Sequence, residues 1–306
     1  MNNYSKNFIS NLIGKKIIIA GCNGYIGNEL SNQLENNNIN YIGIDKTKPK
    51  NNNCYQFNLV DKKSIEDIIL NENPDYFFHL ATHSALAYKN NLLQAFNEDN
   101  SAIYNILVNL KKTKKAKLIY FSSSYVYSGY EHKNPANEKI SLFPKHNFGM
   151  AKLFFENLIT REYENNIIFR LSSVYGDGNY LHPNVIRIMS DEAIKNKKIT
   201  LWGEGERSMQ FIYIEDVVKN VLSVTNLTSG IYNLCNNNYL SQTLRRLRLR
   251  IGLLHGQPFS NPERINDAYN EHAFIIKALE SYDPDIAKSA VAKHYSNARK
   301  SRLSLL

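Results

Sequence analysis

The feature that most constrains the fold is an apolar run followed by three regularly spaced glycines, between residues 16 and 27. Residues 17–20 are all apolar, which is typical of a strand buried on both faces at the centre of a parallel sheet. Gly21, Gly24 and Gly27 follow the run, and helix-favouring residues come next. Glycines at these positions allow a tight turn, a close approach of the backbone to a pyrophosphate, and close packing of helix on strand. The sequence therefore predicts a glycine turn and a helix whose N-terminal N–H groups can bind phosphates.

A carboxylate follows at the distance that a dinucleotide site requires. The second predicted strand, residues 41–44, is followed directly by Asp45, roughly twenty residues after the glycines. An acid there can accept hydrogen bonds from both hydroxyls of an adenosine ribose and would repel the 2′-phosphate of NADP, so the sequence favours NAD as the cofactor. Lys46 comes next, and because of this lysine NADP stays open as the alternative cofactor. The alternative is an ordinary strand–helix turn with a surface aspartate, but strand, spacing and acid occur together here.

Length and composition are typical of a globular protein with a well-buried core. The 306 residues suffice for one large or two modest domains. No apolar run approaches the roughly 18 residues that span a membrane, and residues 1–14 lack the apolar core of a signal peptide. We expect these residues to form a flexible leader. Cys22, Cys54 and Cys235 show no metal or redox spacing, which predicts reduced, structural cysteines in a cytoplasmic protein.

The charged residues change in kind along the chain. The net charge is +9, but no basic face with interleaved aromatic residues is evident, so we expect solvated lysines and attraction for phosphorylated substrates rather than nucleic-acid binding. Lysine predominates among the basic residues up to about residue 240, and arginine predominates after it. The asparagine runs also end there. This change predicts a domain at 15–240 joined near residue 240 to a tail at 241–306 of foreign origin.

Strand and helix patterns alternate through the first of these segments. We expect further strands at 55–57, 75–81, 118–121 and 167–171, and helices at 62–71, 92–112 and 147–163. Such alternation predicts an α/β fold with a doubly wound parallel sheet of the Rossmann type. Ligands of these sheets bind beyond the carboxyl ends of the strands. From about residue 177, shorter elements, including a strand at 210–214, predict a small substrate-side region.

Residues 15–240 resemble extended short-chain dehydrogenases/reductases of the NAD-dependent epimerase/dehydratase family. The resemblance implies nucleotide-sugar chemistry, in which NAD removes a hydride before epimerisation, dehydration or reduction. It also implies a homodimer formed through helices like 92–112 and 147–163. The motifs that carry it are Gly21-x-x-Gly24-x-x-Gly27, Asp45, His79-Leu80-Ala81-Thr82, Asn100, Ser122-Ser123 with Val126-Tyr127, Arg170 with Val174-Tyr175-Gly176, and residues 211–216.

The same resemblance implies which residues hold the cofactor. Asn58 stands where the family often has an Asp that faces the adenine, and an amide can still make that contact. The implied cofactor-binding residues are Gly21, Gly24, Tyr25, Ile26, Gly27, Asp45, Asn58, Leu59, Leu80, Ala81, Thr82 and Lys152.

The catalytic motif of the family is incomplete in this chain. In the family a Ser or Thr orients the substrate hydroxyl, a Tyr takes its proton, and a Lys four residues later lowers the pKa of the Tyr and binds the nicotinamide ribose. The spacing of four places Tyr and Lys on one helix face, and a phenol with a pKa of about 10 needs the cation near neutral pH. Ser123 matches the Ser and Lys152 the Lys. The Tyr position holds Phe148, which fills the same space but has no proton to exchange.

Three explanations of Phe148 stay open at the sequence level. It can be an engineered replacement that traps bound substrate, another group can take the proton, or the chain can be a pseudo-enzyme that binds NAD. Tyr125, Tyr127 and His146 are the candidates for the other group, although Tyr127 is more often structural in the family and His146 fits a solvated residue before a helix. The resemblance thus implies an epimerase- or reductase-like protein with impaired proton transfer, or a silent NAD-binding or interaction protein.

The substrate positions depart from the family as well. We expect Ser84, Ser123 and Arg207 to contact substrate. The family often places an Arg that clamps a diphosphate where this chain has Met209, so Arg207 either takes over that role or is a surface residue. A dehydratase would favour Asp and Glu directly after the catalytic Ser or Thr. Ser124 and Tyr125 stand there instead, which favours epimerase or reductase chemistry.

The tail is predicted to be helical, with helices at 244–254, 262–280 and 285–301; Asp283 and Pro284 open the last one. It resembles the end of the ligand-binding domain of GntR-type transcription regulators. His272 and His294 fall where that domain places two metal ligands, which leaves open a fusion with a metal-binding regulator tail. Two histidines do not make a closed metal site, so we expect no metal. No helix-turn-helix precedes the basic run at 245–250, so we expect no DNA contact.

Overall fold

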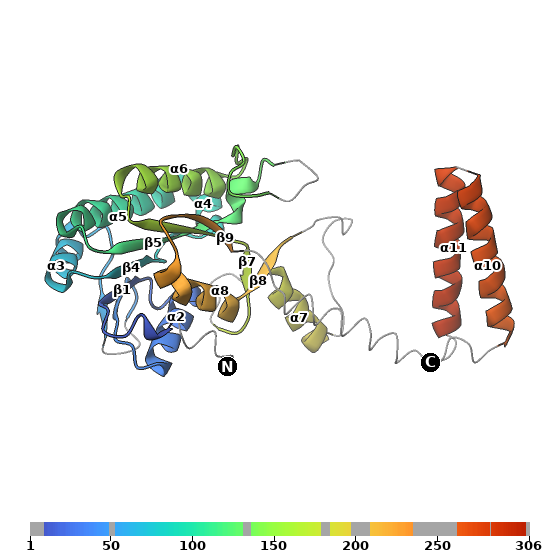
Figure 1. The fold of residues 1–306 in the computed structure, drawn as a ribbon, viewed down its shortest axis with the longest axis horizontal. Coiled ribbons are helices and arrows are strands. Elements are labelled where there is room, and N and C mark those ends of the chain that lie inside the picture. The colour runs from blue at the N-terminus through green and yellow to red at the C-terminus, as the bar shows by residue number, and fades with distance from the viewer. Residues whose placement is uncertain are drawn as a thin grey trace. The chain divides into compact units, whose positions relative to one another are not determined.

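A seven-stranded parallel sheet forms the centre of the first part of the chain (Figure 1). The computed structural model describes residues 9–48, 53–130, 136–178, 184–196, 209–234, 262–281 and 283–303. The chain divides into two compact units, Met1–Asn237 and Asn238–Leu306, and each is described by itself. The predicted boundary near residue 240 lies outside the described residues.

The strand order is that of a doubly wound sheet, as the sequence predicts. The order is β3-β2-β1-β4-β5-β6-β9, and every neighbouring pair is parallel. From β1 the chain adds β2 and β3 on one side, and then crosses back to add β4 and the later strands on the other side. The strand order therefore reverses between β1 and β4, and sheets of this kind bind ligands at that point. The strands are β1 Ile17–Ala20, β2 Ile42–Asp45, β3 Cys54–Gln56, β4 Tyr76–His79, β5 Lys117–Ser123, β6 Asn166–Leu171 and β9 Gly230–Leu234.

Helices cover both faces of this sheet. On one face, α3 (Lys62–Glu72), α5 (Leu92–Thr113) and α6 (Asn147–Glu162) pack on residues such as Ile18 of β1. On the other face, α2 (Tyr25–Asn36) and α8 (Ile214–Leu222) pack on residues such as Ile17 and Ile19 of β1. Alternate side chains of β1 therefore enter two separate cores, which explains its uninterrupted apolar run.

This unit contains further described helices and a small second sheet. They are α4 (Ala85–Asn90), α7 (Val185–Asn196), the 3₁₀ helices η1 (Ser124–Tyr127) and η2 (Ser223–Asn226), and a parallel pair of β7 (Ser173–Tyr175) with β8 (Phe211–Tyr213). The strand predicted at 75–81 ends earlier, at His79, because residues 80–82 leave the sheet and pass beside the glycine turn. Leu12, inside the expected flexible leader, is fully buried in the core, so the chain from residue 9 belongs to the folded unit.

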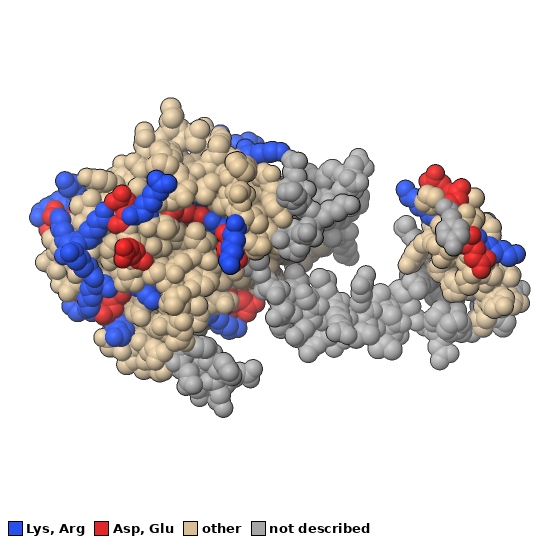
Figure 2. Space-filling view, turned by 45° about the horizontal axis from the view of Figure 1, so that its top comes forward, with Lys and Arg blue, Asp and Glu red and all other residues tan. Residues whose placement is uncertain are grey.

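Charged side chains of both signs share the surface. On the face drawn in Figure 2, Lys and Arg lie among Asp and Glu side chains. Ion pairs on or between α3, α5 and α6 neutralise several lysines locally: Lys63 with Asp67, Lys112 with Glu66, and Lys111 with Glu162. Within the described residues, no helix combines the length and apolar character needed to cross a membrane.

The described part of the second unit consists of two antiparallel helices. These are α10 (Pro262–Glu280) and α11 (Pro284–Leu303), and the backbone N–H groups of Asp285 and Ile286 donate to the Asp283 carboxylate at 2.9 and 3.2 Å. Asp283 therefore caps α11, as predicted. The helix expected at 244–254 lies outside the described residues.

A polar cluster joins α10 to α11. The Glu271 carboxylate accepts hydrogen bonds from Arg264 (3.0 and 3.1 Å), His294 Nδ1 (2.7 Å) and Asn297 (2.9 Å). The His272 and His294 rings lie 4.6 Å apart, but no group of three or more potential metal-binding side chains forms within the described ranges. Burial would raise the pKa of Glu271, yet the bonds from Arg264, Asn297 and His294 outweigh it and hold that pKa at about 2.

We expect the Glu271 cluster to make the hairpin acid-sensitive. Because the pKa is lowered from 4.5 to about 2, the stabilisation is complete above pH 4.5 and is lost as pH falls towards 2. Hydrogen exchange of the full chain, corrected for intrinsic rates, should show protection of α10 and α11 falling across this window. At pH 7, Glu271→Gln should raise exchange there by about tenfold or more, since charged hydrogen bonds are worth about 1.5–3 kcal/mol. Glu280→Gln, on an exposed site of the same helix, should leave exchange unchanged; equal effects would refute the prediction.

Candidate functional site

The glycine turn after β1 has the geometry of a phosphate-binding turn. Gly21 adopts φ +89°, and a Cβ added there would lie 2.8 Å from the backbone nitrogen of Ala81. A Cβ on Gly27 would lie 2.0 Å from the Gly21 carbonyl oxygen, so only glycine allows α2 to pack this closely on the turn. Gly24 is the N-cap of α2 and offers no side chain to cap it. The first turn of α2 therefore presents its backbone to the space above the sheet.

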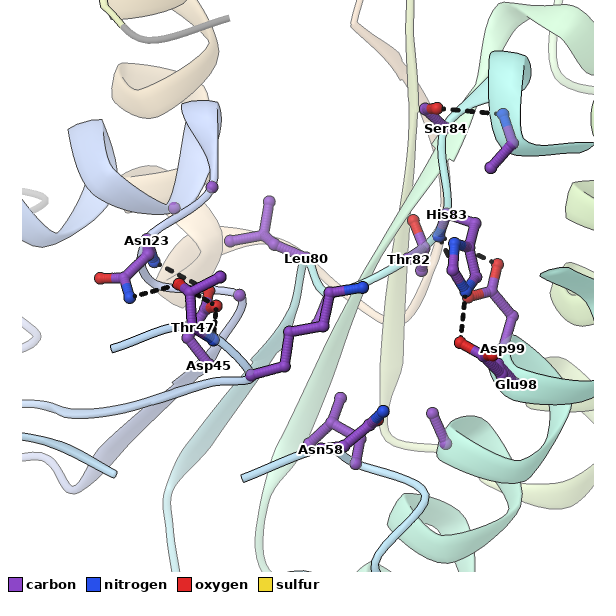
Figure 3. A pocket seen from close by; sticks show the side chains of 18 of the residues that line it. Asn23, Asp45, Thr47, Asn58, Leu80, Thr82, His83, Ser84, Glu98 and Asp99 are labelled. Carbon is purple, nitrogen blue, oxygen red and sulfur yellow. Dashed lines mark hydrogen bonds and ion pairs between the residues drawn. The ribbon is translucent and has the colours of Figure 1, made fainter. Parts of the chain in front are cut away.

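Asp45 lies directly beside this turn. One of its carboxylate oxygens accepts the backbone N–H of Asn23 at 3.1 Å, and the other accepts the N–H and hydroxyl of Thr47 at 2.9 and 2.8 Å. The Asn23 amide in turn donates to the Thr47 hydroxyl at 2.9 Å. Figure 3 shows these three residues gathered on one side of the site. The carboxylate at the end of β2 is thus held in a fixed orientation next to the glycine turn.

A cavity of about 880 Å³ opens over the carboxyl ends of the strands. Its volume is within the range of about 300–1,000 Å³ that is usual for ligand pockets. Of the predicted cofactor-binding residues, all except Lys152 line it, and Ser84 lines it too. These residues are Gly21, Gly24, Tyr25, Ile26, Gly27, Asp45, Asn58, Leu59, Leu80, Ala81 and Thr82.

The wall of the cavity opposite Asp45 carries a cluster of charged and polar side chains that sequence analysis missed. The His83 backbone N–H donates to both oxygens of Asp99, at 3.1 and 3.2 Å, and its ring Nε2 lies 2.8 Å from a Glu98 oxygen. Tyr88 donates its hydroxyl to Asp99 at 2.8 Å. Burial raises the pKa of Asp99, while hydrogen bonds from Gln94 and His83 lower that of Glu98. Figure 3 shows this cluster opposite Asp45.

Lys152 lies behind the cavity wall rather than on it. Its side chain is 3% exposed, and its ammonium group donates to the Thr82 hydroxyl at 3.0 Å and to the Phe121 carbonyl at 2.8 Å. Burial lowers its pKa to about 8, although the nearby Asp99 and Glu156 partly oppose the shift. Through Thr82, which does line the cavity, the ammonium group is one residue away from the cavity.

Phe148 precedes Lys152 by one helical turn on α6. The Lys152 ammonium nitrogen lies 5.4 Å from the centroid of its ring, and the ring also packs against Tyr88 and Tyr125, with centroids 5.5 and 5.7 Å away. Ser123, at the end of β5, accepts the Tyr125 N–H at 3.3 Å. The phenyl group therefore lies on the same side of the helix as the lysine, at the position where the resemblance implies a Tyr.

Two of the three alternative proton acceptors, Tyr127 and His146, are engaged in hydrogen bonds, whereas the Tyr125 ring packs against the His146 and Phe148 rings. The Tyr127 hydroxyl accepts from Arg170 at 2.7 Å and donates to Asn233 at 2.8 Å, and burial raises its pKa. His146 Nδ1 accepts the backbone N–H of Phe148 at 3.2 Å and so caps α6. Arg207 lies outside the described residues, and Met209 is exposed two residues before β8.

A buried ion pair supports the strands beneath the site. The Glu156 carboxylate of α6 accepts from the guanidinium group of Arg170 at 2.6–3.1 Å and from the Ser122 hydroxyl, and both charged side chains are almost fully buried. Arg170 also holds Tyr127, so the pair connects α6, β6 and η1.

We expect Glu156→Gln to destabilise the first unit by about 3–5 kcal/mol, because it leaves a buried guanidinium without its counter-charge. Denaturant unfolding of the full chain measures the change. The matched control is Asp67→Asn, which breaks an exposed ion pair with Lys63 and should cost less than about 1 kcal/mol. A Glu156→Gln effect as small as that of the control would contradict this role of the pair.

The fold and the cavity together define a dinucleotide-binding protein of the doubly wound α/β class. The sequence model of the NAD dependent epimerase/dehydratase family matches residues 17–235. The chain therefore belongs to the NAD-dependent epimerase/dehydratase family, whose cofactor is NAD. A second match, to the FCD domain, covers residues 226–297 and agrees with the predicted resemblance of the tail to the ligand-binding domain of GntR-type regulators.

Several relatives of this chain are named as nucleotide-sugar enzymes, and others as beta subunits of methionine adenosyltransferase 2. A dTDP-D-glucose 4,6-dehydratase of Dictyostelium discoideum is 30% identical over 254 residues, which are 71% of this chain but only 56% of that protein. A UDP-glucose 4-epimerase of Mycoplasma pneumoniae is 25% identical over 286 residues, covering 83% of this chain and 80% of that protein. The crystal structure of Thermus thermophilus UDP-glucose 4-epimerase in complex with NAD superposes with a TM-score of 0.65 at 20% identity, over 72% of this chain and 78% of that one. The structural likeness concerns the fold.

Proposed function

We propose that this protein is an NAD-dependent nucleotide-sugar epimerase- or reductase-like protein in which Phe148 impairs proton transfer. The single observation that carries the proposal is the cavity, which unites the three glycines of the turn, Asp45 and seven further residues expected at a cofactor site. Family membership supports the same chemistry.

The residues of the cavity fit a dinucleotide. The glycine turn and the first turn of α2 would hold the pyrophosphate, because a side chain at Gly21 or Gly27 would collide with backbone. Asp45 would accept the hydroxyls of the adenosine ribose, and Asn58 with Leu59 would border the adenine. Leu80, Ala81 and Thr82 would line the path to the nicotinamide ribose, beside which Lys152 would stand. Bound NAD would supply a hydride acceptor and donor.

The sugar would lie against Ser123, Ser84 and Phe148, and Arg207 would contact its diphosphate. The Ser123 hydroxyl would orient a sugar hydroxyl, since it is the polar group at the end of β5. The cation of Lys152 would favour a negative charge developing beside it. Phe148 has no acceptor for the proton of the sugar hydroxyl, so turnover would be slow even with a complete cofactor site.

A silent NAD-binding or interaction protein is the second candidate, and the engagement of Tyr127 and His146 favours it. Both candidates predict NAD binding and differ in what Phe148→Tyr does. The test is a panel of UDP-, dTDP- and GDP-hexoses incubated with NAD and either protein, with nucleotide-sugar products separated by chromatography. Product formation that depends on the restored hydroxyl supports the first candidate, and NAD binding without product in both proteins supports the second.

A further inference from the structure

Two cysteine sulfurs meet behind the glycine turn. Cys22 lies within the turn between β1 and α2, and Cys54 is the first residue of β3. Their Sγ atoms are 3.2 Å apart, although 32 positions separate the residues in the chain. A disulfide bond is about 2.05 Å long, so the sulfurs need to approach each other by only about 1 Å.

The space for the two sulfurs exists because residue 43 has no side chain. Gly43 pairs with Cys54 across β2 and β3. A Cβ on Gly43 would lie 2.3 Å from the Cys54 sulfur and 2.7 Å from the Cys22 sulfur. The glycine therefore leaves a hollow in which the two side chains, one from the turn and one from the strand next to β2, face each other.

We propose that Cys22 and Cys54 are a redox-active dithiol, which hydrogen peroxide converts into an intramolecular disulfide that ties the glycine turn to β3. Cys54 is partly exposed and Cys22 is buried, so the oxidant reaches Cys54 first. The Cys54 sulfur attacks a peroxide oxygen, which gives a sulfenic acid and one water. The Cys22 sulfur then attacks the sulfenic sulfur, the S–S bond forms and a second water leaves. The two thiols lose two electrons, and the peroxide gains them.

Burial makes this oxidation slow at neutral pH. It raises the pKa of both the Cys22 and the Cys54 thiol, and the thiolate is the form that attacks. The rate of disulfide formation should therefore rise with pH. An added oxidant is therefore needed to close the bond at neutral pH.

Closure of the disulfide would disturb the cavity, a consequence that rests on the proposed function. Asn23, which follows Cys22 in the chain, donates its backbone N–H to Asp45. Gly21 and Gly24, which flank Cys22 and Asn23 in the chain, both line the cavity. Drawing Cys22 towards β3 moves these groups from the positions that would receive pyrophosphate and ribose. Oxidation should therefore weaken NAD binding.

The test uses the full chain with Cys235→Ser, which leaves Cys22 and Cys54 as its only cysteines. Hydrogen peroxide should lower the mass by two hydrogen atoms, give a cross-linked peptide containing both cysteines, and be reversed by dithiothreitol. The matched control adds Cys54→Ser, which keeps a similar shape but cannot close the bond. If both thiols of the Cys235→Ser protein can still be alkylated after peroxide treatment, the dithiol is ruled out.

Calorimetry with NAD separates the disulfide from its consequence. The oxidised Cys235→Ser protein should bind NAD more weakly than its reduced form, and dithiothreitol should restore the affinity. A disulfide that leaves the NAD affinity unchanged overturns the coupling to the cavity. Absence of NAD binding to the reduced protein instead overturns the proposed function, while the mass and peptide results still decide the disulfide.

Discussion

Phe148→Tyr should raise turnover of a nucleotide sugar by a factor on the order of 10²–10⁴, the usual contribution of a positioned proton acceptor. The substitution adds a hydroxyl to a ring that already packs between Tyr88 and Tyr125, with the Lys152 ammonium 5.4 Å from its centroid. The cation would lower the pKa of the new phenol, because a nearby positive charge favours the phenolate. Separation of the products of the hexose panel measures the gain.

The matched control for this gain is Phe154→Tyr on the same helix. Phe154 is half exposed, and its ring packs against Phe96 and Phe155 instead of lying under the Lys152 ammonium group, so its new hydroxyl should leave turnover unchanged. A double variant, Phe148→Tyr with Lys152→Met, should lose most of the gain, because the phenol then lacks its cation. If Phe148→Tyr produces no turnover while NAD still binds, the silent protein becomes the better account.

Asp45→Ala should weaken NAD binding by about 10²-fold. Hydrogen bonds to a charged group are worth about 1.5–3 kcal/mol each, and the carboxylate is expected to accept two ribose hydroxyls, so a loss of about 3 kcal/mol is a conservative expectation. The same change removes the repulsion of a 2′-phosphate, so the preference for NAD over NADP should fall as well. Calorimetry with both nucleotides measures the two effects.

Two controls separate ribose recognition from damage to the turn. Asp45→Asn retains oxygen and nitrogen near Asn23 and Thr47 and should bind NAD with intermediate affinity. Asp61→Ala removes an exposed helix cap of α3 that does not line the cavity and should leave the affinity unchanged. An Asp45→Ala protein with wild-type NAD affinity would show that the carboxylate does not face the ribose.

The parallel sheet explains how much of the cavity could be predicted. Residues at the carboxyl ends of parallel strands share one edge of the sheet, so Gly21, Asp45 and Ala81 could be placed together from strand patterns alone. β9 was missed because residues 230–234 are mostly half-buried at the sheet edge and include a polar Asn233, so they lack a clear apolar pattern. The short α4 was missed since six residues show no helical period.

Contacts that depend on three-dimensional register could not be predicted. The approach of His83 to Glu98 depends on how α5 crosses the strand ends, and no local pattern encodes it. The meeting of Cys22 and Cys54 depends on the pairing of Gly43 with Cys54. Lys152 was expected on the cavity wall, but α6 directs it towards the Thr82 hydroxyl and the Phe121 carbonyl instead.

Calorimetric titration of the full chain, freed of nucleotide, with NAD tests the central claim most directly. The claim is that the glycine turn and Asp45 make the edge of the sheet a dinucleotide site, whatever chemistry Phe148 permits. The account predicts saturable binding of one NAD per chain, weakened by Asp45→Ala and retained in Phe148→Tyr. A wild-type chain that is folded and yet takes up no NAD would contradict it.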